Sequence, residues 1–211
     1  MTRIDSYEDL TEKIVGWLKD YYYDNNSVKA FVVGVSGGID SAVVSSLCAR
    51  TGLPTYVVCM PLESKFENSR LSDVHSKALE AKYDNVKRIE VELFSAYDSL
   101  LKSIDWWTEK GEYTSSEHAN ANTKSRMRMV TLYQIAGTVG GIVVGTGNKV
   151  EDYGVGFYTK YGDGGVDIAP IADLYKSEVW DLGKSLGIDS RIIEAKPTDG
   201  LWDDGRTDED Q

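Results

Sequence analysis

The sequence contains few cysteines and histidines, no long apolar run and no excess of positive charge. Its two cysteines, Cys48 and Cys59, are too few for a disulfide scaffold, so we expect them to be buried reduced thiols. No apolar stretch approaches the roughly 20 residues of a membrane span. The N-terminus also lacks the apolar core of a signal peptide. The sequence therefore predicts a cytoplasmic protein that has no membrane partner.

The charge balance is strongly acidic. The formal net charge is −11 over 211 residues, whereas general nucleic-acid binders need clustered Lys and Arg to neutralise phosphates. We therefore expect no nucleic-acid partner, although a local basic pocket for an anionic nucleotide stays compatible with this charge. Acidic residues dominate from about residue 199 onward, which indicates a solvated or mobile end. Length and composition predict one globular domain over residues 1–211.

Hydrophobic periodicity predicts alternating strands and helices. Strands are expected over residues 30–35, 54–59, 87–93 and 141–145, and helices over residues 6–23, 41–50, 66–83, 123–138 and 176–186. The stretch 94–121 is less clearly patterned, and a glycine-rich loop covers residues 154–165. This alternation predicts an α/β fold with a Rossmann-like parallel sheet and helices on both faces. Ligands of such sheets bind beyond the carboxyl ends of the strands.

The strongest local motif is Val-Gly-Val-Ser-Gly-Gly-Ile-Asp-Ser at residues 33–41, between an expected strand and an expected helix. Gly37 and Gly38 let backbone amides approach a phosphate closely. Ser36 and Ser41 add hydroxyl donors, and the helix start presents free N–H groups. A Gly-Gly pair alone would favour an ordinary tight turn. The whole motif in this setting predicts a phosphate site.

This loop is neither a Walker A loop nor a dinucleotide fingerprint, because the glycine and lysine spacing of both is absent. Asp40 would repel a phosphate unless a cation stands between them. Mg²⁺ held by one or two carboxylates plus phosphate oxygens is the usual solution. Glu151 follows the fourth expected strand and is placed to supply the second carboxylate. His75 and His118 show no metal or triad pattern, so we assign them no role.

Residues 36–41 resemble the pyrophosphate loop of the N-type ATP pyrophosphatases, which cleave ATP between its α and β phosphates. Further stretches resemble the NAD synthetases within that group and occur in the same order. These stretches are residues 122–129, 144–151, 157–167, 170–179, 197–198 and 207–209. The chain is therefore identified as a member of the ammonia-dependent NAD synthetase family.

The resemblance implies roles for individual residues. Contacts to ATP are implied for Gly34, Val35, Ser36, Gly37, Gly38, Ile39, Asp40, Ser41, Thr146, Lys176 and Thr198; Mg²⁺ binding for Asp40 and Glu151; and contacts to deamido-NAD for Arg126, Lys160 and Asp167. From the residue pattern alone, Arg126 and Lys160 are equally compatible with surface charges, and Asp167 with an ordinary turn acid. Lys176 opens a helix, where a bound anion would offset its unfavourable position at the positive dipole end.

The implied reaction has two steps, in which a nicotinate carboxylate attacks the α phosphate of ATP and ammonia then attacks the acyl-adenylate. Its expected substrates are ATP, deamido-NAD and free ammonia, because 211 residues cannot also hold a glutaminase domain. The resemblance further implies a homodimer. Two alternatives stay open: another ATP pyrophosphatase such as a tRNA thiolation enzyme, and a nucleotide-binding module without catalysis. Absent cysteine pairs and the acidic balance oppose the first, and the retained Asp40, Glu151 and Lys176 oppose the second.

Overall fold

The computed structural model describes residues 4–62, 66–108 and 116–195. The helices are α1 (Tyr7–Asp24), α2 (Ile39–Arg50), α3 (Phe66–Lys82), α4 (Phe94–Thr108), α5 (Glu117–Val139), α6 (Lys176–Leu186) and α7 (Ser190–Ile193), and a π-helical turn, η1, covers Val150–Val155. The strands are β1 (Ala30–Gly34), β2 (Thr55–Cys59), β3 (Val86–Glu90) and β4 (Gly141–Val143). Thr198 and the acidic end from residue 199 lie outside the described ranges.

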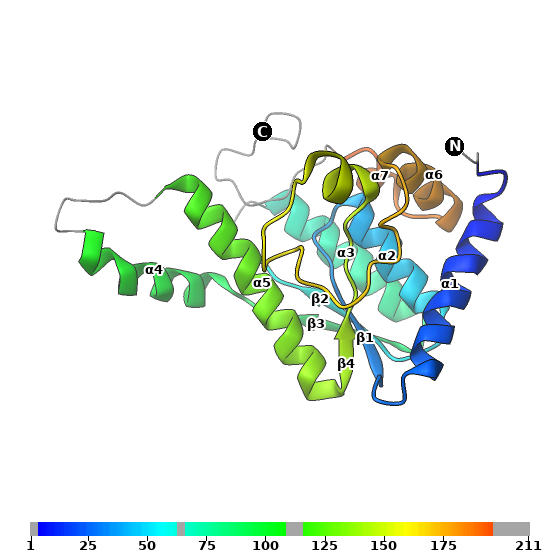
Figure 1. The fold of residues 1–211 in the computed structure, drawn as a ribbon, viewed down its shortest axis with the longest axis horizontal. Coiled ribbons are helices and arrows are strands. Elements are labelled where there is room, and N and C mark those ends of the chain that lie inside the picture. Colours follow the sequence, from blue (N-terminus) through cyan, green and yellow to red (C-terminus); the bar gives the residue numbers. More distant parts are fainter. Residues whose placement is uncertain (1–3, 63–65, 109–115, 196–211) are drawn as a thin grey trace.

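The four strands form one parallel sheet in the order β3-β2-β1-β4 (Figure 1). Successive strands β1, β2 and β3 extend the sheet in one direction, and β4 then returns to the other side of β1. The direction of winding therefore reverses between β1 and β4. In open parallel sheets this reversal opens a crevice at the carboxyl ends of the two strands, where ligands bind. The loop at Ser36 and the segment after Val143 both leave from that point.

Helices pack on both faces of the sheet because side chains of β1 alternate between them. Phe31 and Val33 are fully buried in one cluster that also takes side chains of α1, α2 and α6. Val32 is fully buried in a second cluster, together with Ala136 and Leu132 of α5. The predicted α/β fold with helices on both faces is therefore confirmed.

The largest differences from the sequence prediction lie around α4 and α5. The stretch 94–121 forms α4 and the start of α5, which begins at Glu117 rather than at Thr123. Ser116 caps α5 by accepting a hydrogen bond from the Ala119 amide at 3.1 Å. Asn120 and Asn122 lie in the first two turns of α5. Their weak helix propensity explains why the sequence did not predict this early start. Figure 1 shows α4 extending away from the sheet at one side of the molecule.

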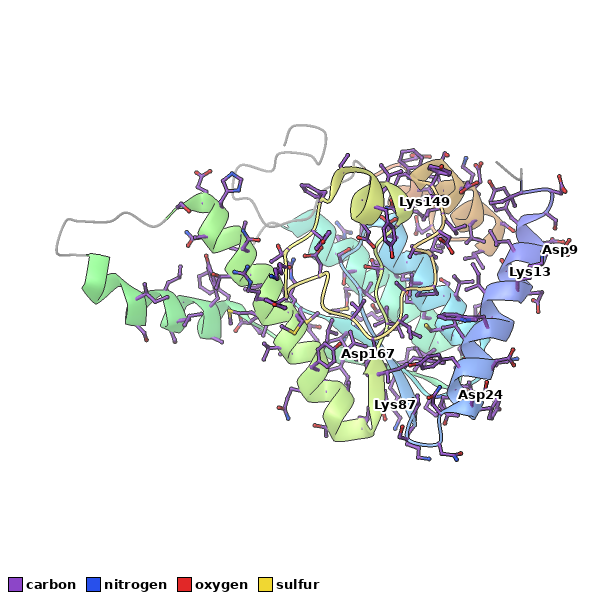
Figure 2. The ribbon with its side chains drawn as sticks, in the orientation of Figure 1. Asp9, Lys13, Asp24, Lys87, Lys149 and Asp167 are labelled. Carbon is purple, nitrogen blue, oxygen red and sulfur yellow. The ribbon has the colours of Figure 1, made fainter. Side chains whose placement is uncertain are left out.

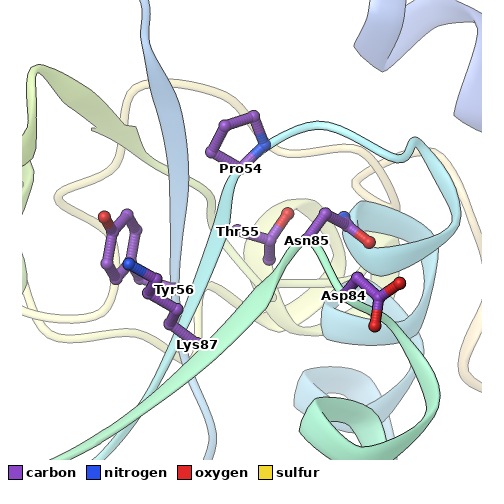
Figure 3. Close-up of a pocket in the computed structure, with 6 residues that line it drawn as sticks. All are labelled: Pro54, Thr55, Tyr56, Asp84, Asn85 and Lys87. Carbon is purple, nitrogen blue, oxygen red and sulfur yellow. The ribbon is translucent and has the colours of Figure 1, made fainter.

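A pocket lies at the opposite end of the sheet from this crevice (Figure 3). Its lining comes from the amino ends of β2 and β3 and the turns before them: Pro54, Thr55, Tyr56, Asp84, Asn85 and Lys87. Asn85 ties the two turns together, since its side-chain amide donates to the carbonyls of Ala49 at 3.0 Å and Leu53 at 2.8 Å. Parallel sheets bind ligands at the carboxyl ends of their strands, so this pocket is not the candidate nucleotide site. Within the described ranges, no helix combines the length and apolar character of a membrane span.

His75 is buried on the face of α3 that packs against α2, with 6% of its surface exposed. Its Nε2 lies 3.0 Å from the hydroxyl of Ser45 on α2. Burial lowers the pKa of His75 from its usual 6.5 to about 4, although the Ala42 carbonyl and the Asp189 carboxylate both favour the protonated ring. The side chain is therefore neutral at physiological pH.

Replacing His75 by Gln should reduce the loss of unfolding free energy that occurs as the pH falls from about 6.5 to about 4. In the unfolded chain His75 takes up a proton near pH 6.5, whereas the folded ring stays neutral down to about pH 4. The unfolded state thus binds more protons between these values, and wild-type stability falls as the pH drops through them. The full interval is worth roughly 3 kcal/mol. Urea unfolding of both proteins, at about pH 7.5 and about pH 4.5, measures the difference; parallel pH profiles would contradict it.

Candidate functional site

The loop between β1 and α2 has a fixed set of internal hydrogen bonds. The Ser41 hydroxyl donates to the Gly38 carbonyl at 3.0 Å and accepts from the Ser36 amide at 3.2 Å. The Ser36 hydroxyl in turn accepts from the Gly38 amide at 3.2 Å. Gly37 has a φ of +94°, a backbone conformation that residues other than glycine rarely adopt. The loop is thus built by its own hydroxyls and one left-handed glycine.

This loop ends at the N-terminus of α2 without a side-chain cap. Gly38 is the N-cap residue and offers no side chain, and no described side chain bonds to the first-turn amides in its place. Free amides and the positive end of the helix dipole together favour an anion at this position. Val35 and Ile39 face the core instead and are 4% and 5% exposed. A ligand here would meet their backbone rather than their side chains.

Three segments far apart in the sequence meet at Lys176. The Lys176 ammonium lies 2.5 Å from an oxygen of Asp40 on α2 and 2.8 Å from an oxygen of Glu151 on η1. The three side chains are between 16% and 26% exposed. Burial opposes the charge on Lys176, but the two carboxylates outweigh it and raise the pKa of Lys176 above its usual range. Asp40 and Glu151 therefore converge on one cation, the Lys176 ammonium.

Asn148 organises both carboxylates from a fully buried position. Its side-chain amide donates to Asp40 at 3.0 Å, while its carbonyl oxygen accepts from the amides of Val150 at 3.0 Å and Glu151 at 3.2 Å. One buried side chain thus fixes an oxygen of Asp40 and the start of η1 at the same time. Short π-helical turns of this kind often occur at functional sites.

Asp152 adds a further acid to this neighbourhood. Burial, followed by the nearby charges of Glu151, Asp163 and Asp40, raises the pKa of Asp152. Its carboxylate packs against Gly147, where a Cβ atom would lie 2.2 Å from an Asp152 oxygen. The segment between β4 and η1 can therefore run this close to Asp152 only because residue 147 is glycine.

Thr146 lies in that segment, three residues beyond the carboxyl end of β4. Gly145 before it donates to the Ile168 carbonyl at 2.7 Å and leaves no room for a side chain, because a Cβ would lie 2.7 Å from Val166. The structure thus places Thr146 at the same crevice as Ser36.

Arg126 and Lys160 lie together at a neighbouring position. The Arg126 guanidinium donates from Nε to the Lys160 carbonyl at 3.1 Å, and both side chains are exposed. The Lys160 ammonium lies 5.0 Å from the centre of the Tyr161 ring. Tyr161 has φ of +61° and is the only described residue other than glycine with a positive φ. Lys160 and the exposed Tyr161 ring therefore lie in one strained turn, to which Arg126 of α5 is bonded.

Side chains of α5 fasten this turn. Asn122 accepts from the Thr159 hydroxyl at 2.8 Å, and Ser125 donates to Asp163 at 2.7 Å. Asp163 also accepts from the Thr159 amide at 2.9 Å, which closes the turn on itself. Asn122, Ser125 and Arg126 stand three and four residues apart and so share one face of the helix. The glycine-rich loop predicted over residues 154–165 is consequently bonded to α5 along its second half.

Comparisons with known proteins agree with this arrangement. A profile described as NAD synthase matches residues 10–211. The NH3-dependent NAD+ synthetase of Carboxydothermus hydrogenoformans is 38% identical over 205 residues, which cover 97% of this chain and 80% of that protein. The enzyme of the same name from Methanococcoides burtonii is 40% identical over 189 residues, covering 89% of this chain and 68% of that protein.

The chain belongs to the NAD synthase family.

Solved structures support the same family. The structure of NMN synthetase from Francisella tularensis has a TM-score of 0.87 at 35% identity, covering 98% of this chain and 81% of that one. The NH3-dependent NAD synthetase from Campylobacter jejuni has a TM-score of 0.76 at 29% identity, covering 89% of this chain and 76% of that one. The predicted family is confirmed, and with it an ATP-using ligase that forms an amide C–N bond.

Asp167 lies apart from the other two residues predicted to contact deamido-NAD. Its carboxylate accepts from the Tyr133 hydroxyl at 3.0 Å and from the Val143 amide at 2.8 Å. Asp167 therefore links β4 to α5 through these two hydrogen bonds, and Figure 2 shows Asp167 beside these two elements. A substrate contact would have to share one of these two oxygens. Burial and the bond to Asp167 raise the pKa of Tyr133 to about 12, so Tyr133 stays a donor.

Sequence reasoning missed two residues of this NAD synthase site. Asn148 and Asp152 stand in or beside the stretch 144–151 that carries the family resemblance, but neither was assigned a role. An asparagine three residues before a predicted metal carboxylate could have indicated a bridging amide. For Lys176, two carboxylates offset its position at the start of α6, and its contact with ATP stays a prediction. Thr198 lies outside the described residues.

Proposed function

We propose that this chain performs the last step of NAD biosynthesis, the ATP-dependent amidation of deamido-NAD by ammonia with release of AMP and pyrophosphate. The single observation that carries the proposal is the meeting of Asp40, Glu151 and Lys176 beside the uncapped start of α2. This cluster puts two carboxylates and one cation where the pyrophosphate of ATP would bind. A loop that binds phosphate through backbone amides alone would need neither carboxylate.

The phosphates of ATP would bind at the loop from Gly34 to Ser41. The free amides at the start of α2 would face the negative charge, and the hydroxyls of Ser36 and Ser41, which bond within the loop, fix its shape before the ligand arrives. Thr146 would contact ATP from the other side of the crevice. Thr198, which the family resemblance also assigns to ATP, remains a proposal from the sequence.

Asp40 and Glu151 are the proposed holders of Mg²⁺. The fit rests on the shared ammonium, because both carboxylates already converge on one positive charge. In the described part of the chain, no cluster of three or more His, Cys, Asp and Glu side chains forms a metal centre. A site with two carboxylates suits Mg²⁺, which keeps water or phosphate oxygens in its remaining positions. The bound ion would supply charge neutralisation on the phosphates.

Lys176 would change partners during the reaction. In the ligand-free protein its ammonium neutralises two carboxylates that would otherwise repel each other. With those carboxylates paired elsewhere, the same ammonium can turn to a phosphate oxygen of ATP. No side chain then has to form a covalent bond, since the nicotinate carboxylate is the nucleophile and ammonia the second one. Positioning and charge stabilisation are the contributions of the protein.

Arg126 and Lys160 are the proposed contacts of deamido-NAD, whose pyrophosphate carries the negative charge that two exposed cations can bind. Arg126 belongs to α5, and the turn of Lys160 is fastened to that helix through Asn122, Ser125 and Asp163. The cations are thus presented by a helix and a turn bonded to it rather than by a free loop, so less ordering is needed on binding. Asp167 would act at the rim of this region, with an oxygen shared between Tyr133 and the substrate.

Product analysis tests the reaction. Incubation with ATP, Mg²⁺, ammonia and deamido-NAD should yield AMP, pyrophosphate and NAD in equal amounts by chromatography, because the loop is of the pyrophosphate type. The relative from Francisella tularensis is named NMN synthetase, so the mononucleotide counterpart of deamido-NAD is the second candidate acceptor. Faster turnover of the mononucleotide would move the function to that acceptor. ADP and phosphate as products would contradict both.

Arginine variants locate the acceptor within the same assay. Loss of a charge-assisted contact costs roughly 1.5–3 kcal/mol, so Arg126→Ala should raise the KM for the acceptor about ten- to a hundred-fold. The KM for ATP should stay within about twofold, since the guanidinium lies with the turn at Lys160 and outside the carboxylate cluster. Arg50→Ala, at the exposed far end of α2, is the matched control and should change neither.

Direct metal titration tests the two carboxylates. In Asp40→Asn and in Glu151→Gln, Mn²⁺ affinity measured by electron paramagnetic resonance with a non-cleavable ATP analogue should fall about tenfold or more, because a neutral amide replaces a charged ligand. Both variants should keep the wild-type circular dichroism, since each replacement has nearly the same shape. Asp173→Asn, at an exposed aspartate before α6, serves as the control. Unchanged Mn²⁺ affinity in both variants would show that Asp40 and Glu151 serve only to hold Lys176.

We also infer that two copies of the chain associate through α4 and α5. Both helices expose apolar side chains: Leu100 and Ile104 of α4 are 41% and 45% exposed, and Val130 of α5 is 60% exposed. Leu100 and Ile104 stand one helical turn apart, on a helix that extends away from the sheet. Exposed apolar surface of this extent often marks a protein interface, and a second copy would supply a matching helix pair.

Sedimentation velocity tests this association. The wild-type chain should sediment as a dimer at micromolar concentration, whereas Val130→Glu should be monomeric because it places a charge in the interface. Tyr23→Glu is the matched control: Tyr23 is 66% exposed but lies at the end of α1, away from α4 and α5. A wild-type monomer, or a dimer that survives Val130→Glu, would rule out this interface.

A further inference from the structure

Helix α3 buries a polar face where an apolar one would be usual. Ser72, His75 and Ser76 are 4%, 6% and 0% exposed. They stand three and four residues apart and therefore share one face of the helix. A helix that packs on a sheet normally buries an apolar stripe on that side. Buried polar groups lower stability unless they are hydrogen-bonded, so each of these three needs a partner.

Ser72 finds its partner at the start of the pyrophosphate loop. Its hydroxyl donates to the Val35 carbonyl at 2.7 Å, across a sequence distance of 37 residues. Val35 is the residue directly before Ser36, and its own amide donates to Val58 of β2 at 2.9 Å. The backbone of Val35, which leads from β1 into the loop, is therefore fixed by two hydrogen bonds. One comes from the Ser72 side chain and the other joins it to the backbone of β2.

His75 reaches the other end of the loop. Its Nε2 lies 3.0 Å from the Ser45 hydroxyl, and Ser45 donates to the Ser41 carbonyl at 2.7 Å. Because the Ser45 proton is used toward Ser41, the neutral ring is the donor to Ser45. Ser41 is the last residue of the loop and carries one of its two hydroxyls. The ring thus fixes the first turn of α2 through one intervening serine.

Ser76 completes the face at β2. Its hydroxyl lies 3.1 Å from the sulfur of Cys59, the last residue of that strand. The three polar side chains of α3 therefore each bond to a different element at the carboxyl end of the sheet: the residue after β1, the first turns of α2, and the end of β2. Apolar side chains would pack there without fixing any of these positions, since apolar contacts have no preferred direction.

We propose that Ser72 and His75 are positioning residues for ATP, which hold the two ends of the pyrophosphate loop in the geometry that the phosphates require. The inference rests on the function proposed above and deepens it at the same site. Neither side chain touches the ligand. Their effect passes through the Val35 carbonyl and through Ser45 to the amides and hydroxyls that do. Among the described side chains of α3, none bonds to Arg126 or Lys160, the proposed contacts of the acceptor.

The test compares ATP affinity in four variants by isothermal titration with Mg²⁺ and ATP, alongside the KM for ATP and for the acceptor. Ser72→Ala and His75→Leu each remove one hydrogen bond and should weaken ATP binding about three- to tenfold. His75→Gln retains a donor near the position of Nε2 and should restore most of the affinity. Ser76→Ala is the matched control, because Ser76 is equally buried on the same face of α3 yet bonds to Cys59 of β2 rather than to either end of the loop.

The expected result is a rise in the KM for ATP in Ser72→Ala and His75→Leu, with the acceptor KM unchanged and with wild-type ATP affinity in Ser76→Ala. ATP affinity like that of the wild type in both positioning variants would overturn the proposal. An equal loss of ATP affinity in Ser76→Ala would also overturn it, because loss of any buried hydrogen bond of α3 would then explain the effect. If His75→Leu does not fold, Ser72→Ala decides. Failure of the proposed function can be distinguished from failure of this proposal, because in that case the wild type itself would release no pyrophosphate.

Discussion

The ion cluster of Lys176 with Asp40 and Glu151 is the interaction on which the site depends. It joins residues separated by 136 and by 25 positions, and so ties the start of α6 to the start of α2 and to η1. Without the ammonium, two carboxylates would face each other in a partly buried place, where their repulsion is poorly screened. The cluster therefore constrains the local fold as well as the chemistry. Asn148 supports the same arrangement through uncharged hydrogen-bonding groups, because its side chain bonds both to Asp40 and to the backbone of η1.

The sheet order explains why these segments can meet. Since β4 lies on the opposite side of β1 from β2, the loops after β1 and β4 separate into a crevice instead of packing side by side. Helix α5 covers the β1 and β4 side of the sheet, contains Arg126 and holds the turn of Lys160. Helix α3 lies on the other face and bonds to Val35, directly before the loop at Ser36. Each of the two proposed ligand regions thus has its own supporting helix.

Much of this architecture could be predicted from the sequence. Short apolar runs and period-3.6 patterns located the four strands and most helices, and the motif at residues 33–41 located the turn between β1 and α2. What escaped prediction depends on contacts between distant residues. Nothing local to His75 shows that its ring meets Ser45, and nothing near Lys176 shows that its anions are carboxylates. The early start of α5 was missed because its asparagines have a weak helix propensity. In the structure, the Ser116 cap and the hydrogen bond between Asn122 and Thr159 stabilise this part of the helix.

The choice of lysine at the centre of the ion cluster follows from what the site has to do. An arginine could hold one carboxylate through two parallel hydrogen bonds, and such a pair is directional and slow to exchange partners. A lysine ammonium is a compact point charge on a flexible stem, so it can pair with Asp40 and Glu151 at once and then with a phosphate. The two carboxylates raise its pKa, so Lys176 stays charged while it is paired with them. In the proposed function, an incoming nucleotide with its counter-ion would rearrange this cluster by exchanging one anionic partner of the ammonium for another.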